Sequence, residues 1–109
     1  MKLSDKELEI MKVLWKSDAP MTATDIITAA SERTWQDISI HGLLKSLLEK
    51  EAIQVDHYRP TSAKSARAYI PSLTVEEYAV RDILELDVDV KKLYAVITNK
   101  LFGSQNHGS

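Results

Sequence analysis

The chain has 109 residues, of which 44% are hydrophobic and 28% charged, and its formal net charge is -2. A chain of this length and composition folds as one modest globular domain, at most with a small appendage, and leaves little room for a catalytic pocket. It contains no cysteine, which excludes disulfides and thiolate metal sites. No apolar run is long enough to span a bilayer and the first residues lack the apolar core of a signal peptide, so we expect a cytoplasmic protein.

The first helix is expected to begin at a capping box. Ser4 and Glu7 have the S-x-x-E spacing in which each side chain accepts a hydrogen bond from the other's backbone N–H. The helix should run to about Lys16. Trp15 lies on its apolar face and is expected in the core, because an aromatic residue at this spacing is far more often core than ligand site.

A second helix follows the turn at Pro20. Thr22 and Asp25 form a weaker box at its start. Thr22 and Thr24 would then lie at the positive end of the helix dipole, where hydroxyls and free amides suit a phosphate oxygen. Helix capping alone accounts for these threonines equally well.

Residues 35–52 contain a third helix, and the rest of the chain is organised around it. Its apolar residues recur at intervals of three and four, the spacing of one buried stripe; they are Ile40, Leu43, Leu44, Leu47 and Leu48. The opposite face is small and mostly uncharged, and its candidate contact residues are Ser39, His41, Gly42, Lys45 and Ser46. Asp37 is expected as a cap or first-turn acid, where it would repel a phosphate unless it faces away.

A basic β-hairpin follows the third helix. Residues 53–58 and 68–70 read as strands, and the first of them alternates as a half-buried strand does. Residues 57–75 carry Arg59, Lys64 and Arg67 without an acid, whereas residues 1–56 and 76–109 are net negative. Since duplex binding depends on neutralising phosphates, these three cations are candidate phosphate contacts, although an ordinary solvated loop explains them as well. A helix with an exposed polar face followed by a basic hairpin is the layout of a winged helix-turn-helix.

No metal or cofactor site is expected. His41 and His57 are separated by a helix and a strand, and no third ligand stands at a spacing typical of zinc sites.

Two further amphipathic helices close the chain. Thr74 and Glu77 form a third capping box, Asp89 is a good cap for the last helix, and Gly103 is a plausible stop. We expect residues 104–109 to be disordered. The apolar residues of these helices can form a homodimer, the commonest oligomer, or fold back on their own domain. The candidate dimerisation residues are Tyr78, Ile83, Leu86, Leu93, Tyr94, Ile97 and Leu101.

The ordered set of these segments resembles the penicillinase-repressor family of bacterial transcription regulators over roughly residues 3–78. The resemblance is carried by residues of every segment, namely Leu3, Glu7, Met11, Leu14, Trp15, Thr22, Ala23, Ile26, Ile27, Trp35, Leu43, Leu47, Arg67, Tyr69, Glu76, Glu77 and Tyr78. It implies an N-terminal winged-helix domain with C-terminal dimerising helices that represses promoters by binding operator dyads. We accordingly expect a DNA-binding domain at 1–72, dimerisation helices at 73–103 and a tail at 104–109, a mainly α (α+β) architecture.

The chain departs from the family pattern at the start of the third helix. The family's Ser-Pro-Lys-Thr is replaced by residues 36–39, Gln-Asp-Ile-Ser, and Glu51 stands where a glycine usually closes the helix. The Asn-Phe bond that a membrane sensor protease cuts in some members is not found, since Lys100 follows Asn99. The cysteines of the copper-responsive branch are absent too. Both routes of induction are therefore in doubt.

Three functions are compatible with these patterns. The first is a dimeric DNA-binding repressor of a palindromic operator, in which the hairpin cations hold phosphates and the third helix faces base edges in the major groove. The second is a winged-helix interaction or dimerisation module with weakened or lost DNA binding, which the acidic balance favours. An enzyme is the least supported, because the chain has no recognisable constellation of catalytic residues.

Overall fold

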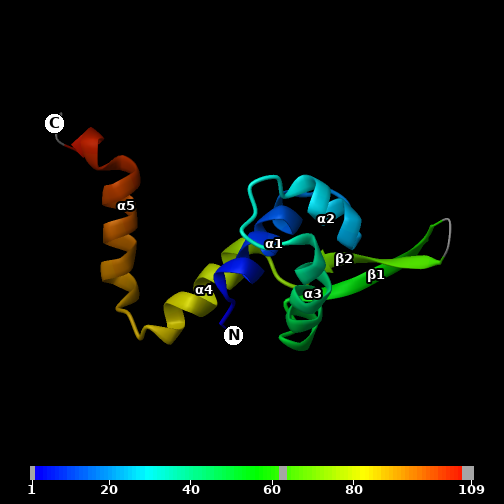
Figure 1. Cartoon of the computed structure of the whole chain (residues 1–109). Helices are drawn as coiled ribbons and strands as arrows, with labels where there is room; N and C mark the ends of the chain where they lie inside the picture. The colour runs from blue at the N-terminus through cyan, green and yellow to red at the C-terminus, as the bar shows by residue number, and fades with distance from the viewer. Residues whose placement is uncertain (1, 62–63, 107–109) are drawn as a thin grey trace.

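The computed structural model describes residues 2–61 and 64–106. Its elements are α1 (Asp5–Lys16), α2 (Ala23–Ala29), the 3-10 turn η1 (Asp37–Ser39), α3 (Ile40–Glu49), β1 (Ile53–Pro60), β2 (Ser65–Pro71), α4 (Val75–Glu85) and α5 (Val90–Asn106). Figure 1 shows α1, α2 and α3 gathered at the root of the β1–β2 hairpin, while α4 and α5 extend away on the other side. The predicted winged helix-turn-helix is confirmed, and we call the hairpin the wing.

The capping boxes set the starts of three helices as predicted. The Ser4 hydroxyl accepts a hydrogen bond from the Glu7 backbone at 3.1 Å, and the Glu7 carboxylate accepts one from the Ser4 backbone at 2.8 Å. The same reciprocal pair is present at Thr22 with Asp25, and at Thr74 with Glu77. Each box satisfies two backbone N–H groups that a helix N-terminus otherwise leaves unpaired.

The core lies between α1, α2, α3 and the root of the wing. Its largest fully buried side chains come from the apolar stripes of the three helices, namely Ile10, Met11, Ile26, Ile40, Leu44 and Leu47. Burying the α3 stripe turns the polar face of that helix outward, as the pattern predicted. α3 ends at Glu49, and Glu51, two residues further on, has a φ of 60°, the left-handed conformation that usually favours glycine after a helix.

The wing is longer than predicted. β1 and β2 pair antiparallel from Ile53 with Pro71 out to Pro60 with Ser65, so the predicted loop residues 60 and 65–66 are paired strand. A bulge between Val55 and His57 interrupts the register. The predicted half-buried alternation therefore stops at the bulge, and His57 is exposed beside Asp56 rather than turned inward.

A third backbone segment lines the wing at its root. Met21, predicted only as part of a turn, forms an antiparallel bridge with Tyr69, in which its N–H donates to the Tyr69 carbonyl at 3.0 Å and its own carbonyl accepts at 2.8 Å. The bridge attaches the start of α2 to β2, and so fixes α2 against the wing.

α4 is joined to the winged-helix core at its first turn. The Trp15 indole N–H donates to the Leu73 carbonyl at 2.9 Å, and the rings of Trp15 and Tyr78 lie 5.8 Å apart between centroids. Trp15 packs against the core as predicted. The packing continues past the expected boundary at residue 72, since Leu73 is buried.

α5 extends away from the rest of the chain (Figure 1). The chain as a whole therefore has an elongated shape, 64 × 29 × 24 Å along its principal axes. Asp89 caps α5 as predicted, accepting hydrogen bonds from the backbone of Lys91 and Lys92. The helix continues through Gly103 to Asn106, so the predicted stop at Gly103 is wrong. Of the tail predicted as disordered, residues 104–106 are helical and residues 107–109 lie outside the described part of the chain. Among the described residues, no helix has the length and apolar character that crossing a membrane requires.

Candidate nucleic-acid interface

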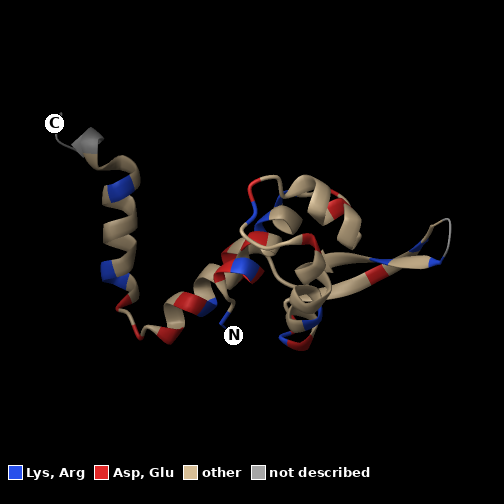
Figure 2. Cartoon of the chain, in the orientation of Figure 1, with Lys and Arg blue, Asp and Glu red and all other residues tan. Residues whose placement is uncertain are grey.

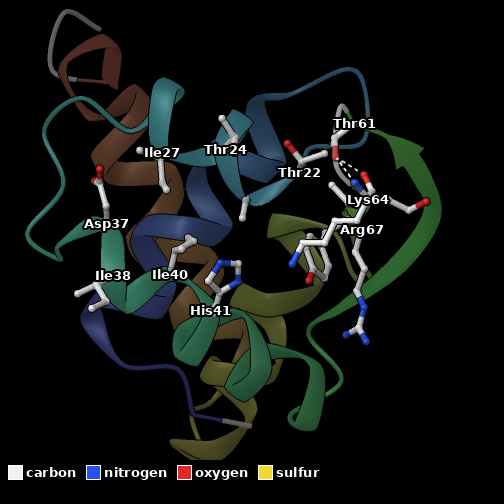
Figure 3. A pocket seen from close by; sticks show the side chains of 14 residues that line it. Thr22, Thr24, Ile27, Asp37, Ile38, Ile40, His41, Thr61, Lys64 and Arg67 are labelled. Atoms are coloured by element: carbon white, nitrogen blue, oxygen red, sulfur yellow. Dashed lines mark hydrogen bonds between the residues drawn. The ribbon is translucent and has the colours of Figure 1, made fainter.

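An open cleft of about 760 Å³ lies between the start of α2, the start of α3 and the wing. Five of the predicted contact residues line it: Thr22, Thr24, His41, Lys64 and Arg67. Figure 3 shows Asp37 and Ile38 on the α3 side and Lys64 and Arg67 on the wing side, with His41 between them. The structure thus brings residues from three separate segments to one surface.

The wing side of this cleft carries the positive charge. Figure 2 shows basic residues along the wing and toward its tip. Thr61 closes the tip, since its N–H donates to the Lys64 carbonyl at 2.9 Å. Within the described residues, no acidic side chain pairs with Lys64 or Arg67. Both cations therefore remain available to an anionic partner.

Arg59 was predicted to share this role, but the structure places it elsewhere. Its guanidinium donates to the Asp25 carboxylate at 2.7 Å and to the Pro20 carbonyl at 3.3 Å. The pKa of Asp25 is lowered chiefly by the hydrogen bond from the Thr22 backbone, with a further contribution from Arg59. Arg59 therefore braces the wing against α2 and compensates the carboxylate at the start of that helix.

The two threonines of α2 differ in access. Thr22 is 6% exposed and its hydroxyl accepts a hydrogen bond from the Asp25 backbone, so its capping role is realised. Thr24 is exposed on the cleft. Of the two, only Thr24 presents a hydroxyl to a partner at this surface.

On α3 the predicted residues separate into two groups. Ser39, Gly42 and Lys45 are exposed on the helix but lie outside the lining of the cleft, whereas His41 is part of it. A β-carbon added at Gly42 would meet no atom of the protein within 4 Å, so the fold does not require glycine there.

Ser46 does not face the cleft, contrary to the prediction. Its hydroxyl donates to the Glu7 carboxylate at 2.6 Å, and the Lys50 ammonium donates to the same carboxylate at 2.6 Å. Burial by itself raises the pKa of Glu7, but these hydrogen bonds and that from the Ser4 backbone outweigh it and hold the pKa at about 2. This cluster attaches the end of α3 to the start of α1.

Asp37 is neutralised by a partner that the pattern did not identify. Arg33 pairs with it, and the same guanidinium donates to the carbonyls of Ile27 at 3.2 Å and Ala30 at 3.1 Å. Arg33 also lies over the Trp35 ring, 4.9 Å from its centroid. Opposite charges four residues apart could have indicated this ion pair, but that spacing predicts a contact only within a helix. Arg33 lies in the non-helical connection between α2 and η1.

Ile38 also lines the cleft, although it is not among the predicted contact residues. It belongs to η1 and is 85% exposed.

The predicted dimerisation residues also separate. Tyr78 packs on Trp15 within the chain, and Ile83 and Leu93 are partly buried. Of the large apolar side chains in α4, α5 and the turn between them, the most exposed are Tyr94 at 72%, Leu86 at 71% and Leu101 at 68%. Ile97 is 44% exposed. Among the described residues, no cluster of three or more histidine, cysteine or acidic side chains is arranged to hold a metal ion.

Comparisons with known proteins bear on the same segments. A family model described as Penicillinase repressor matches residues 3–97, from just before α1 to the middle of α5. A search of curated proteins finds no match. The family is one of DNA-binding transcriptional repressors rather than enzymes. Because the match covers most of the chain and the fold is a winged helix, the chain belongs to the penicillinase repressor family.

Proposed function

We propose that this protein is a homodimeric repressor that binds a palindromic operator in double-stranded DNA, with α3 in the major groove and the wing on the flanking backbone. The observation that carries the proposal is the cleft, where the exposed face of α3 meets Lys64 and Arg67 on the wing. Phosphate contacts fix the position of a protein on the duplex, and contacts in the groove read the sequence. The cytoplasm, where bacterial DNA lies, is the compartment that this role requires.

The roles of the cleft residues, and of the exposed residues of η1 and α3 beside the cleft, follow from their chemistry. Lys64 and Arg67 hold phosphates, with Thr24 as a neutral donor at the start of α2. His41 and Lys45, together with the backbone at Gly42 and the hydroxyl of Ser39, face base edges. Arg33 supports this arrangement, since it compensates the charge of Asp37 at the start of the recognition helix.

Exposed apolar side chains on α5 support the dimer. Val90, Tyr94, Ile97 and Leu101 alternate at spacings of four and three, as the seam of a coiled coil does. All four are exposed in the single chain, and α5 does not lie on the recognition surface (Figure 1). A second copy that packs on this seam covers apolar surface without blocking the cleft.

The alternative is a winged-helix interaction module that no longer binds DNA. The net charge of -2 and the scarcity of cations on α3 favour it. Fluorescence anisotropy of a labelled random duplex distinguishes the two. The repressor binds at low salt, and log K falls with log salt by roughly 0.9 for each phosphate neutralised. The interaction module does not bind under the same conditions.

Replacement of Lys64 and Arg67 by alanine tests the assigned roles. The variant should bind all duplexes more weakly, and the salt slope should fall by roughly one for each cation removed. Lys12→Ala with Lys16→Ala is a matched control, because it removes two exposed cations of α1 that lie outside the cleft. An equal loss of affinity in the control would contradict the phosphate role of the wing.

A further inference from the structure

Ile38 is the most exposed of the large hydrophobic side chains that the structure describes. At 85%, its exposed fraction exceeds those of Tyr94 at 72% and Leu86 at 71%, which lie on the proposed dimer helices. Ile38 lies far from these helices, in η1 just before the recognition helix α3, and it lines the cleft. Neither the core nor the proposed dimer seam accounts for it.

The surroundings of Ile38 offer little to a phosphate. Its neighbour Asp37 is paired with Arg33, and the cations of the cleft, Lys64 and Arg67, come from the wing (Figure 3). The α3 side of the cleft is therefore close to neutral and partly apolar. A duplex held by the wing presents this side with base edges rather than with backbone.

The helix geometry aligns Ile38 with the residues proposed to read bases. His41 and Gly42 follow it by three and four residues and Lys45 by seven, so all four share one face of the continuous η1–α3 segment. Each base pair exposes a distinct set of groups in the major groove, and the apolar member of that set is the C5-methyl of thymine. An exposed isoleucine on this face is suited to that methyl group.

We propose that Ile38 reads the C5-methyl group of a thymine in each operator half-site. The inference rests on the proposed function, because it assumes that α3 enters the major groove. It adds a sequence-determining contact at a position where the family pattern has a cation, and it predicts that this chain discriminates T from C and from uracil there.

The test uses the full-length protein and operators selected from random duplexes. Deoxyuridine replaces each half-site thymine in turn, which removes only the methyl group. For the wild-type protein, the replacement should weaken binding about three- to tenfold at one such position. The reason is that the lost methyl contact contributes about as much free energy as the burial of one methylene group. Deoxyuridine outside the half-sites should have no effect.

Variants of Ile38 test whether this side chain is the one that contacts the methyl group. Ile38→Ser should bind the thymine and deoxyuridine operators equally, and Ile38→Val should retain most of the discrimination. Both variants should keep the circular dichroism spectrum and the salt slope of the wild type, since the side chain is exposed and uncharged.

The outcomes separate the two proposals. If the wild-type protein selects and binds an operator but no half-site thymine shows a methyl effect, or Ile38→Ser keeps that effect, the inference is overturned and the repressor function stands. If the wild-type protein binds no duplex at low salt, the proposed function fails first, and the inference fails with it.

Discussion

Glu7 is the clearest case of one side chain that holds the recognition helix. Its carboxylate is 3% exposed and accepts hydrogen bonds from Ser46 and Lys50 of the α3 end and from the Ser4 backbone. A buried carboxylate is tolerated only when such partners replace its lost hydration. Glu7 is therefore the point at which α1 fixes the orientation of α3 relative to the core.

Glu7→Gln should lower the free energy of unfolding by roughly 2 kcal/mol at neutral pH, because the buried side chain loses its charge-assisted hydrogen bonds from Ser46 and from the partly exposed ammonium of Lys50. The pKa of Glu7 is about 2 in the folded chain, below the ordinary value of 4.5. Its contribution is thus fully present above pH 4.5 and declines as the pH falls toward 2. Urea denaturation at a series of pH values measures the difference between variant and wild type.

The exposed Glu49→Gln is the control for that series, since it removes the same charge from α3 outside the cluster. Its effect should stay within about 0.5 kcal/mol. A gap between wild type and Glu7→Gln that stayed constant from pH 7 to pH 2 would show that the charge of the carboxylate is not what stabilises the fold.

Gly42 has a different meaning, because nothing in the fold requires it. Helical glycine costs about 1 kcal/mol relative to alanine, and a β-carbon at this position has open space around it. Gly42→Ala should therefore raise the free energy of unfolding by about 1 kcal/mol. If α3 lies in the major groove, the added methyl group meets the duplex, and operator affinity should fall while stability rises.

Thr28→Ala is the matched variant for Gly42→Ala. It also raises helix propensity on an exposed helical surface, that of α2, but it lies away from the cleft. Thermal unfolding and operator titrations on both variants separate the effects. Unchanged operator affinity for Gly42→Ala would indicate that the glycine is merely tolerated and that the α3 backbone does not approach DNA closely.

At the scale of elements, the starts of helices were the most predictable features. The capping boxes at Ser4, Thr22 and Thr74 are local chemistry, and the side chains that form each box are three residues apart. The buried stripe of α3 was equally predictable from the sequence, because the spacing of its apolar residues matches the helical period. The boxes therefore predicted where three helices begin, and the stripe predicted which face of α3 is exposed.

Features that depend on distant partners could not be read from local patterns. The bridge between Met21 and Tyr69 has no sequence signature, since a single residue pair supplies all its hydrogen bonds. The bulge after Val55 reverses the facing of the strand beyond it, which alternation alone cannot foresee. Gly103 read as a stop on local grounds but is helical in α5.

The candidate site shows the same division. His41, Lys64 and Arg67 were predicted because residue type and segment sufficed. Ser46 and Arg59 were assigned to DNA because they are polar and occur in the right segments, yet their partners, Glu7 and Asp25, lie in α1 and α2. Such partners come from other segments, so only the fold shows which polar residues are already engaged.

At the scale of the whole molecule, the proposed dimer predicts that α5 pairs with α5 of a second copy. Ile97→Asp places a carboxylate in the proposed seam and should weaken self-association at least tenfold, since an unpaired charge is costly to bury. Sedimentation velocity over a range of concentrations measures the dissociation constant. The affinity for the full palindromic operator should fall as self-association weakens, whereas the affinity for an isolated half-site should not change.

Asn99→Asp is the control for the dimer, because it adds the same charge to α5 away from the Val90–Leu101 seam. It should leave the sedimentation behaviour unchanged. A monomeric wild-type protein, or equal weakening by both substitutions, would be inconsistent with a seam through Ile97.

Native mass spectrometry of the wild-type protein with its selected operator tests the central claim most directly, because it counts chains on one duplex. Two recognition helices with their wings, joined through α5, should give a complex of two chains and one duplex, and Ile97→Asp should shift it to one chain or free DNA. A single wild-type chain on the full palindrome, or no complex at low ionic strength, would contradict the account.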